Sequence, residues 1–90
     1  MDLADRVVLV AGGSGLLGTA IARALAAAGA DIAFTYLERQ DAARETIAAV
    51  EGLGRKAWSV TLDQTDADAI PRAVDAAVKQ FGRLDGLVNN

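Results

Sequence analysis

Residues 7–18 read VVLVAGGSGLLG, an apolar run followed by a short segment that holds four glycines. Continuous apolar runs rich in β-branched residues are typical of strands covered on both faces in a parallel sheet. Residues 16–28 (LLGTAIARALAAA) follow with helical periodicity, which places Leu17, Ile21 and Leu25 on one face. The stretch therefore predicts a strand that passes into a helix through a glycine-rich turn.

Three glycines of this turn have distinct roles in the predicted corner. A helix that begins at the carboxyl edge of a sheet presents unpaired N–H groups and the positive end of its dipole there, which favours phosphate binding. Gly12 permits the tight turn, Gly15 lets the backbone approach an anion, and Gly18 lets the helix pack closely on the strand. The pattern predicts a dinucleotide-binding corner, and a purely structural glycine turn is the alternative.

Strand and helix continue to alternate along the rest of the chain. Strands are predicted over residues 31–36, 56–63 and 84–90, and helices over residues 41–53 and from Thr65 or Asp66 to Phe81. The second strand alternates apolar and polar side chains, so we expect it to be half-buried, and Gly29 is expected to end the first helix. The alternation predicts one domain, residues 1–90, that is half of a doubly wound α/β Rossmann fold. We expect a parallel sheet in strand order 3-2-1-4, with the first two of its three helices on one face and the third on the other.

Composition excludes several classes of function. The net charge is −3 without a basic stripe, which argues against nucleic-acid binding, and the absence of Cys and His removes thiolate metal sites and the commonest general base. No apolar run approaches the roughly 18 residues of a membrane span, and residues 1–6 lack the layout of a signal peptide. We therefore expect a cytoplasmic protein without a metal, nucleic-acid or membrane partner.

Three segments and the spacing between them carry a resemblance to a known family. They are AGGSGLLG (11–18), LDQTD (62–66) and GRLDGLVNN (82–90). Together they resemble the short-chain dehydrogenases/reductases over the whole chain. The first is similar to the family's TGxxxGxG turn, the second to its Asp-Val pair after strand three, and the third to the approach to its Asn-Asn-Ala-Gly segment. Ala11 replaces the opening Thr and its hydroxyl, and Leu16 stands where the family has its second glycine, which has moved to Gly15.

The resemblance implies which residues contact a dinucleotide. The turn would hold the pyrophosphate and adenosine ribose, and Asp63 would contact the adenine amino group. The predicted cofactor-binding residues are Gly12, Gly13, Ser14, Gly15, Leu16, Leu17, Gly18, Tyr36, Arg39, Asp63, Gln64, Asn89 and Asn90. The alternatives are a turn role for Asp63, a helix cap for Ser14 and a frayed terminus for residues 89–90.

The end of the second strand bears on the choice of cofactor. A carboxylate there would accept the ribose 2′-OH of NAD, but Tyr36 occupies that position in this chain. Arg39 follows closely enough to pair with a 2′-phosphate. NADP(H) is therefore the predicted cofactor, with NAD as the alternative, and Arg39 facing solvent is the other interpretation.

The family resemblance implies hydride transfer between a nicotinamide and a carbonyl or alcohol, with Ser, Tyr and Lys as catalytic residues. The family's Tyr-x-x-x-Lys motif lies beyond residue 90, and the single tyrosine, Tyr36, has Gln40 four residues later. We therefore expect an NAD(P)-binding module that is not catalytic by itself. The alternatives are the N-terminal part of an active oxidoreductase and an engineered half-fold that self-assembles without a ligand.

The fourth predicted strand, Leu84 to Asn90, would form an open apolar edge beside a partly bare sheet face. Soluble proteins seldom leave such an edge uncovered. We expect a homodimer in which two such edges pair antiparallel about a two-fold axis. A partly molten or aggregated chain is the alternative.

Overall fold

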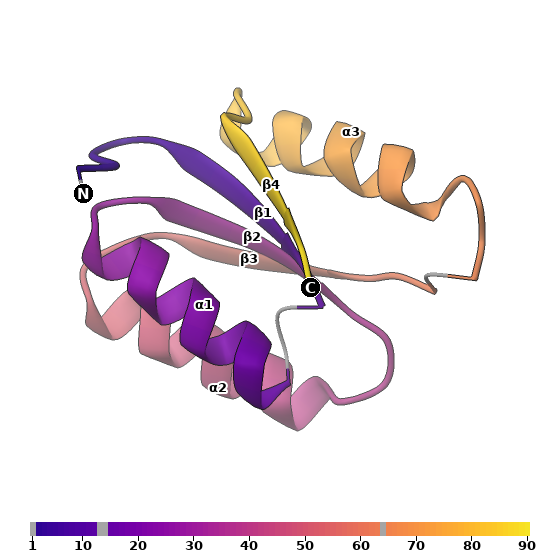
Figure 1. Ribbon diagram of the computed structural model, residues 1–90, viewed down its shortest axis with the longest axis horizontal. Coiled ribbons are helices and arrows are strands. Elements are labelled where there is room, and N and C mark those ends of the chain that lie inside the picture. Colours follow the sequence, from indigo (N-terminus) through magenta and orange to yellow (C-terminus); the bar gives the residue numbers. More distant parts are fainter. Residues whose placement is uncertain (1, 13–14, 64) are drawn as a thin grey trace.

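The computed structural model describes residues 2–12, 15–63 and 65–90 of the chain, and these form a parallel sheet between two layers of helices (Figure 1). The elements in chain order are β1 (Val7–Ala11), α1 (Leu16–Ala27), β2 (Asp31–Tyr36), α2 (Gln40–Gly52), β3 (Ala57–Thr61), α3 (Ala69–Phe81) and β4 (Gly86–Asn89). The strand order is β3-β2-β1-β4 and every neighbouring pair is parallel. The predicted fold class and strand order are therefore confirmed.

Two apolar clusters hold the layers together, one on each face of the sheet. Val8, Val10, Ile32 and Phe34 pack with α1 and α2, whereas Leu9 and its neighbours pack with α3. Figure 1 shows α1 and α2 side by side below the sheet and α3 above it. Because side chains alternate between the faces of a strand and both faces of β1 are covered, all five residues of β1 are buried.

The buried face of α1 differs from the predicted one. Gly18, Ala22 and Ala26 are buried, whereas Leu17 is 63% exposed. Small side chains let the helix axis approach the sheet closely, so α1 turns its small residues inward and leaves the larger ones at the flank. The prediction was therefore wrong for Leu17, whereas Ile21 and Leu25 are partly buried against the core as predicted. The buried Gly18 agrees with the predicted close packing of helix and strand.

Strand β2 is buried on both faces, so the prediction of a half-buried strand was wrong. Residues 32–35 are all buried, including the polar Thr35. The reason is the position of β2 between β1 and β3, with helices on both faces of the sheet. The alternation includes the polar Thr35, which is nevertheless buried because its hydroxyl has a hydrogen-bond partner.

Helix α3 begins later than predicted because two aspartates form local turns. The Asp63 carboxylate accepts the backbone N–H and the hydroxyl of Thr65 at 2.9 and 2.7 Å, and Asp66 accepts the backbone N–H of Asp68 at 2.9 Å. Such side chains compete with the helix for backbone donors. The helix therefore begins at Ala69, with Pro71 in its first turn, and ends at Gly82, which has a φ of +82°.

Gly29 ends α1 as predicted and also leaves room for the N-terminal segment. Its φ is +107°, and a Cβ on it would lie 2.9 Å from the Cα of Ala4. The backbone N–H of Leu3 donates to the carbonyl of Ala28 at 2.8 Å, and that of Asp5 donates to the carbonyl of Gly29 at 3.2 Å. The N-terminal segment therefore lies directly against the end of the helix.

Neither a membrane span nor a metal centre is found among the described residues. None of their helices is long and apolar enough to cross a bilayer. Within the same residues, no cluster of three or more His, Cys, Asp or Glu side chains is arranged to hold a metal ion.

Candidate functional site

The glycine turn connects β1 to α1 at the carboxyl edge of the sheet. Gly12 follows the last residue of β1 with a φ of +83°, a backbone conformation that favours glycine. A Cβ at this position would also lie 3.4 Å from the carbonyl oxygen of Asn90. The predicted tight turn at Gly12 is therefore present; Gly13 and Ser14 lie outside the described residues.

The beginning of α1 is open toward solvent. Gly15 is the N-cap, and the first bond of the helix runs from the N–H of Thr19 to the carbonyl of Gly15 at 2.8 Å. The N–H groups of residues 16–18 precede that bond and have no intrahelical acceptor. A Cβ on Gly15 would meet no other described residue within 4 Å, and Leu16 is 94% exposed. Among the described residues, these N–H groups have no acceptor within the helix, and the positive end of the helix dipole lies at the same place, which suits an anion.

Side chains from the two sides of β1, one on β2 and one directly after β4, form hydrogen bonds with the N–H and the carbonyl of Gly12. Its N–H donates to Thr35 Oγ1 at 2.8 Å, and its carbonyl accepts a hydrogen bond from Asn90 Nδ2 at 3.0 Å. The backbone N–H of Asn90 also donates to the carbonyl of Ala11 at 3.1 Å. Asn90 therefore contacts the glycine turn. Thr35 was missed by the sequence analysis, although a hydroxyl in a buried strand position is a signal that a polar partner lies nearby.

A cleft of about 300 Å³ opens at the carboxyl ends of the strands beside this turn. Its lining residues are Gly12, Thr35, Tyr36, Leu37, Leu62, Asp63, Thr65 and Asn90. The structure thus brings together four of the predicted site residues, which are Gly12, Tyr36, Asp63 and Asn90. They come from the ends of all four strands, the position at which doubly wound sheets bind ligands.

The other predicted residues lie elsewhere. Gly18 is buried in α1, and Leu16 and Leu17 are exposed at its beginning. Asn89 ends β4 and does not line the cleft, and Gln64 lies outside the described residues.

Arg39 does not line the cleft, but it follows the lining residue Leu37 by two positions in the chain. It precedes α2 as the N-cap residue, and its side chain is 72% exposed. Its guanidinium contacts Asp41 at 3.4 Å, and this hydrogen bond is the main reason that the pKa of Asp41 lies below its ordinary value. Exposed ion pairs of this kind contribute little free energy, so Arg39 is free to exchange Asp41 for another anion.

The carboxylate of Asp63 is already engaged by its own turn. Its hydrogen bonds from Thr65, first from the hydroxyl and then from the backbone N–H, lower its pKa below the ordinary value. It is therefore an ionised acceptor at neutral pH that also lines the cleft. The turn role and the cleft position are both present in the structure.

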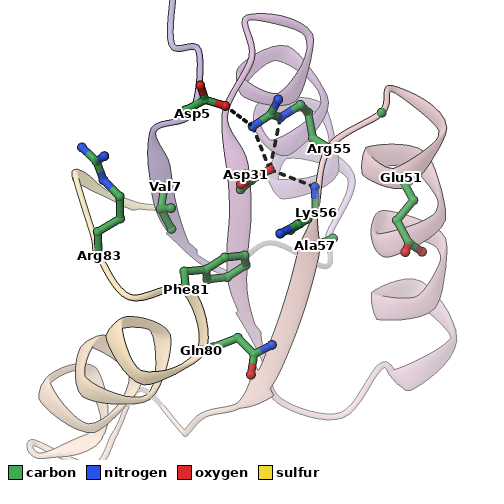
Figure 2. A pocket seen from close by; sticks show the side chains of 11 residues that line it. Asp5, Val7, Asp31, Glu51, Arg55, Lys56, Ala57, Gln80, Phe81 and Arg83 are labelled. Carbon is green, nitrogen blue, oxygen red and sulfur yellow. Dashed lines mark hydrogen bonds and ion pairs between the residues drawn. The ribbon is translucent and has the colours of Figure 1, made fainter.

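A larger cavity, of about 670 Å³, lies at the opposite end of the sheet (Figure 2). The Arg55 guanidinium contacts the Asp31 carboxylate at 3.1 Å and that of Asp5 at 3.4 Å, and Asp31 also accepts the backbone N–H of Lys56 at 2.9 Å. These groups are paired with one another, and none of the predicted site residues lines the cavity. We interpret this end as a brace that joins the beginnings of the strands.

Asp85 makes a separate group of contacts at the same end of the sheet, between β4 and β1, and we include it in the brace. Its carboxylate accepts hydrogen bonds from Arg83 Nε at 2.9 Å and from the backbone N–H of Val7 at 2.8 Å, and Arg6 lies 3.5 Å away. The bond from Arg83, followed by that from Val7, lowers the pKa of Asp85 to about 2. The carboxylate therefore stays ionised far into the acid range and ties the beginning of β4 to the beginning of β1.

Comparison with known proteins decides the family. A family model described as short chain dehydrogenase matches residues 6–90. The chain belongs to the short-chain dehydrogenase family. The predicted resemblance is therefore confirmed, and the chain is a Rossmann module of that family.

Relatives in the short-chain dehydrogenase family are similar along the whole chain. A short-chain dehydrogenase/reductase, FrzI, of a Cladobotryum species is 42% identical over 89 residues, which are 99% of this chain and 34% of that protein. A solved short-chain dehydrogenase/reductase from Serratia marcescens has a TM-score of 0.94 and 43% identity, and the match covers 100% of this chain and 37% of that one. Another from Burkholderia cenocepacia, in complex with NADP, has a TM-score of 0.94, 44% identity and the same coverages. This chain thus spans about a third of the length of the relatives it matches.

Proposed function

We propose that these 90 residues form the dinucleotide-binding part of an NADP(H)-dependent oxidoreductase. The observation that carries the proposal is the open beginning of α1 beside Gly12 and Gly15, because unpaired N–H groups at a helix N-terminus bind phosphate. Membership of the short-chain dehydrogenase family and the NADP in the Burkholderia cenocepacia structure support it.

Three parts of NADP, which are the pyrophosphate, the adenosine and the 2′-phosphate, have a matching group in the proposed site. The pyrophosphate would lie at the beginning of α1, close to Gly15, where no Cβ obstructs the backbone. The adenosine would enter the cleft of about 300 Å³, with Asp63 as an acceptor for the adenine amino group and Tyr36 beside the ribose. Arg39 would turn from Asp41 toward the 2′-phosphate of NADP.

The nicotinamide supplies hydride chemistry when the cofactor is bound. We propose that this chain contributes binding and orientation, because its single tyrosine, Tyr36, lies beside the adenosine cleft and has Gln40 four residues later. The substrate and the acid–base group would then come from segments outside residues 1–90. The single-domain organisation and the cytoplasmic location stay predictions.

Arg39→Ala is expected to weaken NADPH binding about tenfold, because one charge-assisted hydrogen bond to the 2′-phosphate is lost. NADH affinity is expected to stay unchanged, since NADH has no phosphate at that position. Titration of each dinucleotide, followed by nicotinamide fluorescence, measures both affinities.

The exposed Arg23 of α1 offers a matched control, because Arg23→Ala removes the same charge at a distance from the cleft. An equal loss for NADPH and NADH in Arg39→Ala would contradict the 2′-phosphate role. A chain that binds neither dinucleotide would contradict the proposed function itself and would favour a half-fold without a ligand.

For the 90-residue chain in solution, we also propose a homodimer through the outer edge of β4. That edge pairs with no strand among the described residues, and Leu87 on it is 47% exposed. A cavity of about 400 Å³ beside this edge is lined mostly by apolar residues, which are Leu3, Val8, Leu25, Gly86, Leu87 and Val88, together with the charged Arg6 and Asp85. Antiparallel pairing with a second copy would cover both features.

Leu87→Lys is expected to shift this chain from dimer to monomer, because it places a charge in the shared apolar surface. Leu53→Lys is the matched control, since Leu53 is 46% exposed at the end of α2 and away from that edge. Analytical ultracentrifugation measures the mass in solution. A wild-type monomer at high micromolar concentration would rule the homodimer out.

A further inference from the structure

We infer that Thr35 is a positioning residue for the dinucleotide site, because its hydroxyl fixes the peptide group of Gly12 in the orientation that shapes the cleft. The inference rests on the proposed function and adds a residue that the predicted site did not contain.

The backbone pairing between β1 and β2 ends just before the glycine turn. The paired positions run from Val7 with Asp31 to Val10 with Phe34. Beyond them the chain turns at Gly12, whose N–H donates to Thr35 Oγ1 at 2.8 Å. A side-chain hydroxyl thus continues the pairing at the point where the two backbones separate and the cleft begins.

The position of the Thr35 hydroxyl is fixed by the sheet. Thr35 is 1% exposed, and it pairs with Val60 in β3. A buried threonine in an interior strand has little freedom at χ1, so its oxygen cannot follow a displaced partner. The location of the Gly12 peptide is therefore set by β2 as well as by its own strand.

The N–H and the carbonyl of Gly12 have hydrogen-bond partners that differ in burial. Its carbonyl accepts a hydrogen bond from the exposed Asn90 side chain at the end of β4, whereas its N–H is bound to the buried Thr35. Loss of the buried acceptor leaves a partly buried N–H without compensation, and the turn is then expected to rotate toward water. Because Gly12 lines the cleft, this rotation changes the site before a ligand arrives and raises the ordering cost of binding.

Thr35→Val tests the inference, because it removes the hydroxyl and keeps the branched shape. We expect NADPH affinity to fall by up to about tenfold, because binding must then restore the turn that this one hydrogen bond held in place. We also expect hydrogen exchange of the Gly12 amide, followed by NMR, to accelerate about tenfold, because the same hydrogen bond is lost. Thr35→Ser restores the hydroxyl and is expected to return both values to those of the wild type.

Thr61→Val provides the matched control, since Thr61 is an exposed threonine at the end of the neighbouring strand β3 and is expected to change neither value. Far-UV circular dichroism establishes that each variant is folded, and Thr35→Ala replaces the valine variant if that variant does not fold. Unchanged Gly12 exchange in the variant without the hydroxyl would overturn the inference. So would a loss in Thr35→Ser equal to that in Thr35→Val, because the restored hydroxyl would then fail to restore the site.

Failure of the proposed function is distinguishable from failure of the inference. If the wild type binds no NADPH, the dinucleotide function fails and the cofactor role of Thr35 falls with it. Accelerated Gly12 exchange combined with unchanged NADPH affinity would show that Thr35 holds the turn but does not set the site, and would also overturn the inference.

Discussion

Gly15→Asp is expected to abolish dinucleotide binding while the fold stays intact. The backbone of Gly15 has φ −84° and ψ 177°, an extended conformation that any residue adopts, and a Cβ there meets nothing within 4 Å. Aspartate is also a favourable N-cap residue, so the beginning of α1 is expected to keep or gain stability. Its carboxylate, however, would stand where the pyrophosphate is proposed to lie.

The expected size of this effect follows from Coulomb repulsion. Two unit charges about 5 Å apart at an effective dielectric constant of about 20 repel by roughly 3 kcal/mol, which weakens binding about 100-fold or more. Titration with NADPH, with a thermal melt of each protein, measures the affinity and the stability separately.

Gly15→Asn is the matched control, because it adds a side chain of the same size and capping ability without the charge. We expect it to bind more weakly than the wild type but more tightly than Gly15→Asp. If the two variants bind equally, the corner does not hold a negatively charged group close to Gly15, and the proposed function loses the observation that carries it.

Gly29→Ala is expected to cause the largest loss of stability. Its φ of +107° is unfavourable for a residue with a side chain, and the new Cβ would lie 2.9 Å from the Cα of Ala4 and 3.0 Å from its nitrogen. Backbone atoms cannot rotate away as a flexible side chain would. Conformational strain of about 1–2 kcal/mol and a similar overpacking cost together give roughly 3 kcal/mol.

Gly54→Ala separates these two costs. Gly54 has a φ of +79°, but a Cβ on it would meet nothing within 4 Å, so only the conformational strain is expected. Denaturant unfolding gives the free energy of each variant, and roughly 3 kcal/mol corresponds to a melting temperature lower by about 12 °C or more in a domain of this size. Equal losses at the two positions would show that the N-terminal segment does not pack against Gly29 in solution.

The first strand, the turn after it and the place of the site follow from local features of the sequence, whereas the strand order follows from the rules of the doubly wound fold. The apolar run of β1 and the glycines after it determine a parallel strand, a turn and a helix beginning, and these determine the corner. The left-handed residues Gly29 and Gly82 were also predictable as helix ends, because glycine favours that conformation.

The partners of the turn could not be predicted in the same way. The bond from Gly12 to Thr35 joins residues 23 apart, and the bond from Asn90 to Gly12 joins residues 78 apart. Neither leaves a periodic pattern, because both depend on where strands end after the sheet has assembled. The resemblance to a family pointed to Asn90, whereas the buried hydroxyl of Thr35 indicates a polar partner without identifying it as Gly12.

The errors in the helices have a common origin. Hydrophobic periodicity gives large apolar side chains the most weight. The buried residues of α1, however, are Gly18, Ala22 and Ala26, whose small side chains allow close packing. At the beginning of α3, Asp63 and Asp66 are good capping residues by type, but they satisfy donors in their own turns first. In both helices the outcome depends on which of several possible packing or hydrogen-bond partners a residue meets in the folded chain, and the sequence pattern does not contain that information.

The charged brace of Asp31, Arg55 and Asp85 lies at one end of strands whose other end carries the glycine turn. Five residues of strand separate the two ends by about 16 Å, roughly twice the distance over which physiological salt screens a charge. Substitutions at the charged end could thus change the thermal stability of the domain, and substitutions at the other end could change its ligand preference. Thermal stability and ligand preference would then change almost independently of each other, even in a very small protein.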